Sequence, residues 1–219
     1  MSRTKHPKIL KINGIKDWLS RGFYQKNFPK YLQEDYKIRT FLRQKLKQSL
    51  VEEVEIERSP STLKLIIKTA RPALVIGRGG SGVDELRKGL IRVLDIKQDV
   101  ESKTKRDIKI DIFEIKNPWV SAQLVSQWIA SQIEKMVPFR RVLKMSLSKI
   151  KEQKEIKGSR VEVAGRLNGV EISRREWLKQ DRLPRQTVRS IIDYGFSEAH
   201  CAYGTIGVKV WLYKGEKFE

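Results

Sequence analysis

The chain has 219 residues and carries 46 Lys and Arg against 26 Asp and Glu, which gives a formal net charge of +20. A charge of this size attracts polyanions over several ångströms, so we expect nucleic acid as the partner. One cysteine and two histidines cannot form a disulfide or an ordinary zinc site within the chain, and no apolar run approaches the roughly 18 residues that cross a bilayer, so we expect an intracellular protein with no metal and no membrane partner.

The sequence pattern of the first half of the chain predicts a basic extension, then a helix and three strands. Residues 1–34 are basic and irregular, with aromatic residues among the Lys and Arg, and are interpreted as an extension. Apolar residues at three- and four-residue spacing predict a helix that Asp35 caps and that runs to about Leu50. Strand-like runs over 51–58 and 62–69 flank a Ser-Pro-Ser turn signal and predict a hairpin, and alternating Ile and charged residues predict a third strand over 106–115.

The stretch VIGRGGSGVDELRK, residues 75–88, lies between the hairpin and the third strand and fits two patterns. The spacing Gly77-x-Gly79-x-x-Gly82 is that of a dinucleotide-binding turn, and acidic residues follow at about the required distance. The tetrad Gly77-Arg78-Gly79-Gly80 is instead a GxxG loop between two short helices, as in RNA-binding KH modules. A phosphate-binding P-loop is excluded because no Lys-Ser or Lys-Thr follows the glycines.

The flanks of this stretch favour the GxxG interpretation. Pro72 suits the first turn of a helix and fits poorly in a central parallel strand. The residues that follow the helix after the glycine loop, 95–107, are too polar for a buried parallel strand. In a GxxG loop the glycines let a nucleic-acid backbone approach, and the following helix presents unpaired N–H groups to phosphates. Arg78 adds a charge and Ser81 a hydroxyl group.

The second half changes from a helical to a strand period. Apolar stripes predict a helix over 121–137, ended by Pro138, and a second helix over 139–154. Beyond Gly158, alternation predicts four strands of an antiparallel sheet, over 159–167, 169–177, 187–196 and 204–213. At about 100° per residue, four basic residues of the second helix fall within one arc beside its apolar side. They are Arg140, Arg141, Lys144 and Lys151.

No residues are expected to carry out catalysis. His200 and Cys201 are adjacent, but neighbours on a strand point to opposite faces and cannot share a proton. We therefore expect no catalytic residue, no cofactor, no small-molecule substrate and no enzyme.

Longer stretches carry a specific resemblance. The segment ARPALVIGRGG, within its order of helices and strands, resembles a type II KH domain. The segments PFRRVLKMSLSKI, GSRVEVAGRLNGVEISRREW, DRLPRQTVRSIIDY and EAHCAYGTIGVKVWLYKGE resemble the C-terminal domain of the third protein of the bacterial small ribosomal subunit. The resemblance covers almost the whole chain.

The resemblance implies an α+β fold: a basic extension (1–34), a type II KH domain with a three-stranded sheet (35–117), and a domain of two helices and a four-stranded antiparallel sheet (118–219). It implies a structural constituent of the small-subunit head that binds rRNA and neighbouring ribosomal proteins and lines the path by which mRNA enters. The expected location is the ribosome, in the cytoplasm, with an organelle left open. The alternative is a free RNA-directed factor or enzyme with a borrowed KH fold.

Individual residues take their expected roles from the same resemblance. Gly77, Arg78, Gly79, Gly80 and Ser81 would bind RNA in the KH loop, although many relatives carry two lysines where Arg78-Gly79 stands here. Arg140, Arg141 and Lys144 would face incoming mRNA and help to unwind it, with Lys151 on the same arc. A further group of basic residues in and between the C-terminal strands is assigned to rRNA: Arg166, Arg174, Arg175, Arg182, Arg185 and Arg189.

Overall fold

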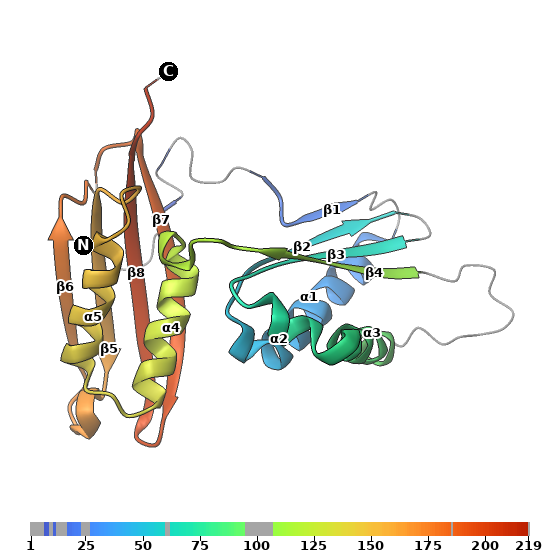
Figure 1. The fold of residues 1–219 in the computed structure, drawn as a ribbon, viewed down its shortest axis with the longest axis horizontal. Coiled ribbons are helices and arrows are strands. Elements are labelled where there is room, and N and C mark those ends of the chain that lie inside the picture. The colour runs from blue at the N-terminus through green and yellow to red at the C-terminus, as the bar shows by residue number, and fades with distance from the viewer. Residues whose placement is uncertain are drawn as a thin grey trace, which may run out of the picture. The chain divides into compact units, whose positions relative to one another are not determined.

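The computed structural model describes residues 7–8, 11, 17–22, 27–59, 62–94, 107–184 and 186–218. The chain divides into two compact units, a first unit of Asp17–Lys116 and a second unit of Asn117–Glu219 together with Met1–Lys16. Each unit has its own hydrophobic core and its own four-stranded sheet (Figure 1). The predicted α+β fold is confirmed.

The sheet of the first unit has the order β1-β2-β3-β4. It consists of β1 (Ser20–Gly22), β2 (Val51–Arg58), β3 (Thr62–Thr69) and β4 (Asp107–Glu114). β2 and β3 form the predicted antiparallel hairpin, whereas β1 pairs with β2 and β4 with β3 in parallel. The predicted count of three strands is corrected to four, because β1 lies within residues 1–34, which were predicted to be an extension. A three-residue strand is too short to show an alternating pattern.

Three α-helices cover one face of this sheet: α1 (Phe28–Lys45), α2 (Pro72–Ile76) and α3 (Ser81–Val93) (Figure 1). The core between helices and sheet is made by one side of each element and includes Ile38 and Leu42 of α1, alternate residues of β3, and Leu90 of α3. Buried and half-buried residues alternate strictly along β3, because every second side chain of a strand points to the same face and here that face packs on the helices.

Helix α1 begins earlier than predicted. Pro29 occupies its first turn, where the missing N–H of proline costs nothing. Asp35, predicted as the capping residue, is instead buried in mid-helix and forms an ion pair with Arg58 of β2. The helix ends at Lys45, before a short 3₁₀ turn, η1 (Lys47–Ser49), and Leu50 then takes a left-handed conformation with φ of 52°.

The second unit is the predicted pair of helices on an antiparallel sheet. Its strands run in the order β6 (Arg174–Asp181), β5 (Gly158–Gly165), β8 (Gly204–Glu216) and β7 (Ser190–Cys201). Helices α4 (Ala122–Glu134) and α5 (Phe139–Lys151) lie on one face of this sheet, after a short turn, η3 (Pro118–Val120) (Figure 1). The core is formed by the apolar sides of both helices and by alternate residues of β5 and β8.

Strand β6 begins five residues later than predicted. Asn168 and Gly169 have φ angles of 57° and 79°, so the chain turns in the short helix η4 (Leu167–Gly169) before the strand starts. The left-handed region suits Asn and Gly better than other residues. Apolar and polar residues alternate from Gly169 onward, so the sequence pattern does not distinguish the residues before Arg174 from the strand itself.

The described N-terminal residues are tied to the second unit. Lys8 forms an ion pair of 2.9 Å with Asp193. The ammonium group of Lys11 donates a hydrogen bond of 2.6 Å to the carbonyl oxygen of Thr187, and burial lowers the pKa of this lysine. Among the described residues no helix is long and apolar enough to cross a membrane.

Candidate nucleic-acid interface

The glycine loop joins α2 to α3 by a tight turn. Gly77 ends α2 with φ of 70°, and Gly79 and Gly80, in the short turn η2 (Arg78–Gly80), have φ of 59° and 86°. All three conformations favour glycine. A Cβ added at Gly79 or Gly80 would meet nothing within 4 Å, so these two positions are left open to a ligand backbone.

Two other glycine positions bring the helices together. A Cβ on Gly77 would lie 2.9 Å from the backbone nitrogen of Gly82, and a Cβ on Gly82 would lie 2.5 Å from the carbonyl oxygen of Val75. Both contacts are closer than real Cβ atoms come to other heavy atoms. The glycine spacing that resembled a dinucleotide motif therefore has a local cause, the close packing of α2 on α3.

The position of the glycine loop in the fold contradicts the dinucleotide-binding interpretation. The motif requires the glycines directly after a strand, and here the five residues of α2 separate them from β3. β3 and β4 are parallel neighbours, as that motif would also require, but the acidic residues at 95–101 lie outside the described residues. The structure therefore supports a GxxG loop between two helices.

The loop surface combines cationic, polar and apolar groups. Arg78 and Ser81 are exposed, and Ser81 begins α3 after Gly80, which has no side chain to cap the helix. The N–H of Ser81 donates to the carbonyl oxygen of Arg78, and the following N–H groups of the first turn of α3, which no side chain caps, are available to an anion. Leu74 and Ile76 of α2 are 56% and 41% exposed beside the loop and offer apolar contact surface. This arrangement suits a sugar-phosphate backbone at the glycines.

Helix α5 separates its charged side from its apolar side as predicted. Val142, Leu143, Leu147 and Ile150 are buried in the core of the second unit. The four basic residues of the predicted arc are all exposed: Arg140, Arg141, Lys144 and Lys151. We call these four residues the α5 basic face. Among the described residues, only Arg140 of this face forms an ion pair, at 3.7 Å from Glu176.

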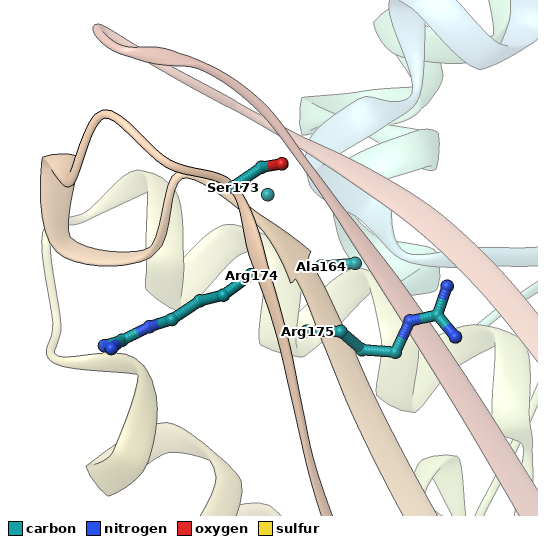
Figure 2. Close-up of a pocket in the computed structure, with 5 residues that line it drawn as sticks. Ala164, Ser173, Arg174 and Arg175 are labelled. Carbon is teal, nitrogen blue, oxygen red and sulfur yellow. The ribbon is translucent and has the colours of Figure 1, made fainter.

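Arg174 extends the α5 basic face onto the sheet. Its guanidinium group lies 3.5 Å from Glu176 and packs over the ring of Phe139 at 5.6 Å, and Arg140 lies over the same ring at 5.8 Å. Figure 2 shows Arg174 and Arg175 pointing to opposite sides of β6. The predicted rRNA-binding group contains both arginines, and they lie on opposite faces of β6.

The remaining arginines of that group have different surroundings. Arg166 donates hydrogen bonds to the carbonyl oxygens of Val170 (3.1 Å) and Tyr203 (3.4 Å), so much of its bonding capacity is used within the protein. Arg182 and Arg189 are exposed, with Arg189 over the ring of Phe218. Arg185 lies outside the described residues. The five arginines of the group that the structure describes thus have different surroundings.

A depression of about 410 Å³ opens at the start of β6, lined by Ala164, Gly165, Ser173, Arg174 and Arg175. Its two arginine side chains diverge, as Figure 2 shows, so they do not converge on a common point inside it. This geometry gives no enclosed site for a small molecule.

β7 continues past the predicted end of the strand at Phe196 and includes His200 and Cys201, with His200 exposed and Cys201 half-buried. Burial and the nearby Glu134 raise the pKa of the Cys201 thiol, which leaves it protonated and weakly nucleophilic at neutral pH. Within the described ranges, no three His, Cys, Asp or Glu side chains gather closely enough to hold a metal ion.

Comparison with known proteins agrees with both units. Residues 37–120 match the KH domain, and residues 129–212 match the C-terminal domain of ribosomal protein S3. The chain is 47% identical to small ribosomal subunit protein uS3 of Caldicellulosiruptor saccharolyticus over 217 residues, which are 99% of this chain and 93% of that protein. The chain belongs to the uS3 family.

Further uS3 proteins show the same full-length similarity. The protein of Endomicrobium trichonymphae is 45% identical over 219 residues, covering 100% of this chain and 90% of its own length. That of Desulfitobacterium hafniense is 43% identical over 216 residues, covering 99% of this chain and 94% of its own length. The bacterial-type family predicted from the sequence is therefore confirmed over nearly the whole chain.

Proposed function

We propose that this protein is a structural constituent of the small ribosomal subunit, with rRNA and neighbouring ribosomal proteins as its partners, and no enzyme. The observation that carries this proposal is the full-length similarity to proteins named as small ribosomal subunit protein uS3. The net charge of +20 supports it, because a chain with this charge becomes more stable when RNA neutralises it.

Two surfaces take different RNA contacts in this proposal. The GxxG loop holds rRNA backbone, because open glycines, the N-terminus of α3 and Arg78 meet at one exposed point. The α5 basic face takes incoming mRNA by its phosphates. Arg141, Lys144 and Lys151 are exposed and form no ion pair among the described residues, so their charges are available. A row of such cations disfavours reannealing of separated strands without nucleotide hydrolysis.

The location proposed for the protein is the head of the subunit, beside the path by which mRNA enters, in the cytoplasm. The rival proposal is a free RNA-directed factor. Sedimentation through high salt distinguishes them, because a constituent stays with purified small subunits after a wash that screens peripheral phosphate contacts. Release of the chain as free protein under that wash would favour the factor.

The mRNA role is tested with ribosomes that contain an R140A/R141A/K144A variant. We expect normal assembly and a normal rate on unstructured messages, but slower translation through a stable hairpin. A K135A/K154A/K157A variant is the matched control, since it removes three exposed cations elsewhere on the second unit. Equal hairpin rates for both variants would contradict the assignment.

A further inference from the structure

The face of the second sheet that lies away from α4 and α5 carries a row of flat side chains. Arg160 of β5 stands opposite Trp211 of β8, which stands opposite Tyr194 of β7. The Arg160 guanidinium carbon lies 5.4 Å from the ring centre of Trp211 and 4.3 Å from that of Trp177 on β6. The rings of Tyr194 and Trp211 are 5.5 Å apart. The four groups form one stack across all four strands.

A buried ion pair fixes the middle of this stack. Arg160 contacts the carboxylate of Glu162 at 2.8 Å, and the two side chains are only 12% and 6% exposed. Burial together with the charge of Glu162 raises the pKa of the Tyr194 phenol. Because Arg160 packs between two Trp rings and is bonded to Glu162, the ring of Trp177 rests on a rigid support.

Trp177 stands between two cations on β6. Arg175, Trp177 and Lys179 occupy alternate positions and so share one face of the strand. Arg174, which precedes them, points to the other side (Figure 2). β6 is an edge strand of its sheet, so ligands can approach this row from the side.

All three side chains of the row are accessible. Trp177 is 50% exposed, which is unusual for the largest apolar side chain. Arg175 contacts Glu162 at 3.1 Å through Nε, yet its side chain is 61% exposed, so the rest of the guanidinium group faces solvent. Lys179 is exposed and forms no ion pair within the described part of the chain.

We propose that Arg175, Trp177 and Lys179 form a binding site for single-stranded RNA, in which Trp177 stacks on an unpaired base and the two cations bind the phosphates beside it. An exposed aromatic ring accepts any base face, and flanking cations on a strand follow a phosphate backbone. The cations on both sides favour nucleic acid over an apolar protein segment by charge complementarity. The site extends the proposed RNA binding and rests on it, but it uses a different face from the α5 basic face.

The test compares two ligands on the full-length chain. One is an unstructured eight-nucleotide RNA of mixed sequence, and the other is the abasic ribose-phosphate chain of the same length. A W177L variant keeps the apolar bulk without the aromatic face, and a W177F variant keeps an aromatic face. An R141A/K144A variant reports on the α5 basic face alone. Fluorescence anisotropy gives the affinities, and ultraviolet crosslinking followed by peptide mapping locates the RNA on the unmodified protein.

Removal of the aromatic face should lower the affinity for mixed-sequence RNA at least about fivefold, with less than about a twofold change for the abasic chain. The W177F variant should stay near the unmodified protein, and crosslinks should include the peptide that contains Trp177. The R141A/K144A variant should lower the affinity for both ligands by the same factor. If it changes neither affinity, the proposal for the α5 basic face fails independently of the Trp177 site. Equal affinity of W177L for mixed-sequence RNA would overturn the site, as would crosslinks of Trp177 to a protein neighbour in purified ribosomes.

Discussion

Arg174 lies 3.5 Å from Glu176, and this carboxylate also lies 3.7 Å from Arg140 of α5. Two cations from different elements therefore share one acid at the border between α5 and β6. The contact joins Arg174 to the α5 basic face, whereas Arg175, its neighbour in sequence, points to the other face of β6 because side chains alternate along a strand. Glu176 thereby holds two arginines of a proposed mRNA surface and cancels part of their charge.

The Glu176→Gln variant should bind single-stranded RNA more tightly than the unmodified protein. The substitution frees Arg140 and Arg174 from a partly exposed ion pair and raises the net charge by one. We expect the slope of log affinity against log salt concentration to become steeper by about 0.7 for each additional phosphate that the variant binds. Anisotropy measurements on a short RNA at several salt concentrations give this slope.

The control for this variant is Glu171→Gln, which makes the same charge change at an exposed acid outside the sheet. If both variants steepen the salt dependence equally, the tighter binding comes from net charge alone, and Glu176 has no special position.

A cation added to the glycine loop should strengthen its RNA contact. Gly79 has φ of 59° and open space around its Cα, so Gly79→Lys fits without a clash. The left-handed conformation should cost about 1 kcal/mol of unfolding free energy. The added charge should tighten RNA binding and steepen the salt slope by about 0.7. Urea unfolding and anisotropy measure the two effects separately, and unchanged RNA affinity would argue that the loop does not contact phosphates.

The sequence was sufficient for features that arise within one element. The cationic and apolar sides of α5 follow from helical geometry alone, because residues three and four apart share a side. The core strands of both sheets likewise show their alternation directly. The family resemblance then supplied the order of the two domains, which the matches to KH and S3 C-terminal models confirm.

Features that depend on contacts between elements were missed. Strand β1 has three residues and no period, and it exists only because it pairs with β2. Asp35 looked like a helix cap because the sequence does not show that Arg58 stands beside it. Arg174 and Arg175 were predicted as one group, although side chains alternate along a strand and adjacent residues therefore lie on opposite faces, as they do on β6.

Replacing Gly82 should damage the loop more than replacing Gly80. A Cβ at Gly82 would lie 2.5 Å from the carbonyl oxygen of Val75, a backbone atom that cannot move without shifting α2. A Cβ at Gly80 would meet nothing, and only its φ of 86° opposes substitution. We expect Gly80→Ala to cost about 1 kcal/mol and Gly82→Ala at least about 2 kcal/mol of unfolding free energy.

Hydrogen exchange of the α2 and α3 amides measures this difference within the first unit, independently of the stability of the second unit. Faster exchange in Gly82→Ala than in Gly80→Ala is the expected order. The reverse order would show that α2 and α3 separate easily, and the close approach of the helices would then lose its role in shaping the loop.

Asp193 should make the second unit sensitive to acid. Burial alone would raise the pKa of this carboxyl group, but Lys8, the N–H of Ala122 and Lys214 together hold it below the usual value. Its oxygens accept a hydrogen bond of 2.9 Å from Ala122 at the start of α4 and contact Lys8 at 2.9 Å. A group with a lowered folded pKa contributes its full stability above its unfolded pKa, about 3.9, and loses it as pH falls through the folded value.

The Asp193→Asn variant should therefore lose about 1–3 kcal/mol of unfolding free energy at neutral pH, because the neutral amide cannot form the ion pair with Lys8. The loss stays in this range because part of the ion pair is exposed to solvent, which weakens it. Below about pH 4 the difference from the unmodified protein should shrink, since protonation removes the same charge there. Urea unfolding at neutral and acidic pH measures both values. Asp181→Asn, at an exposed residue of the same unit, should change neither, and a constant deficit of Asp193→Asn at every pH would show that shape rather than charge makes the contact.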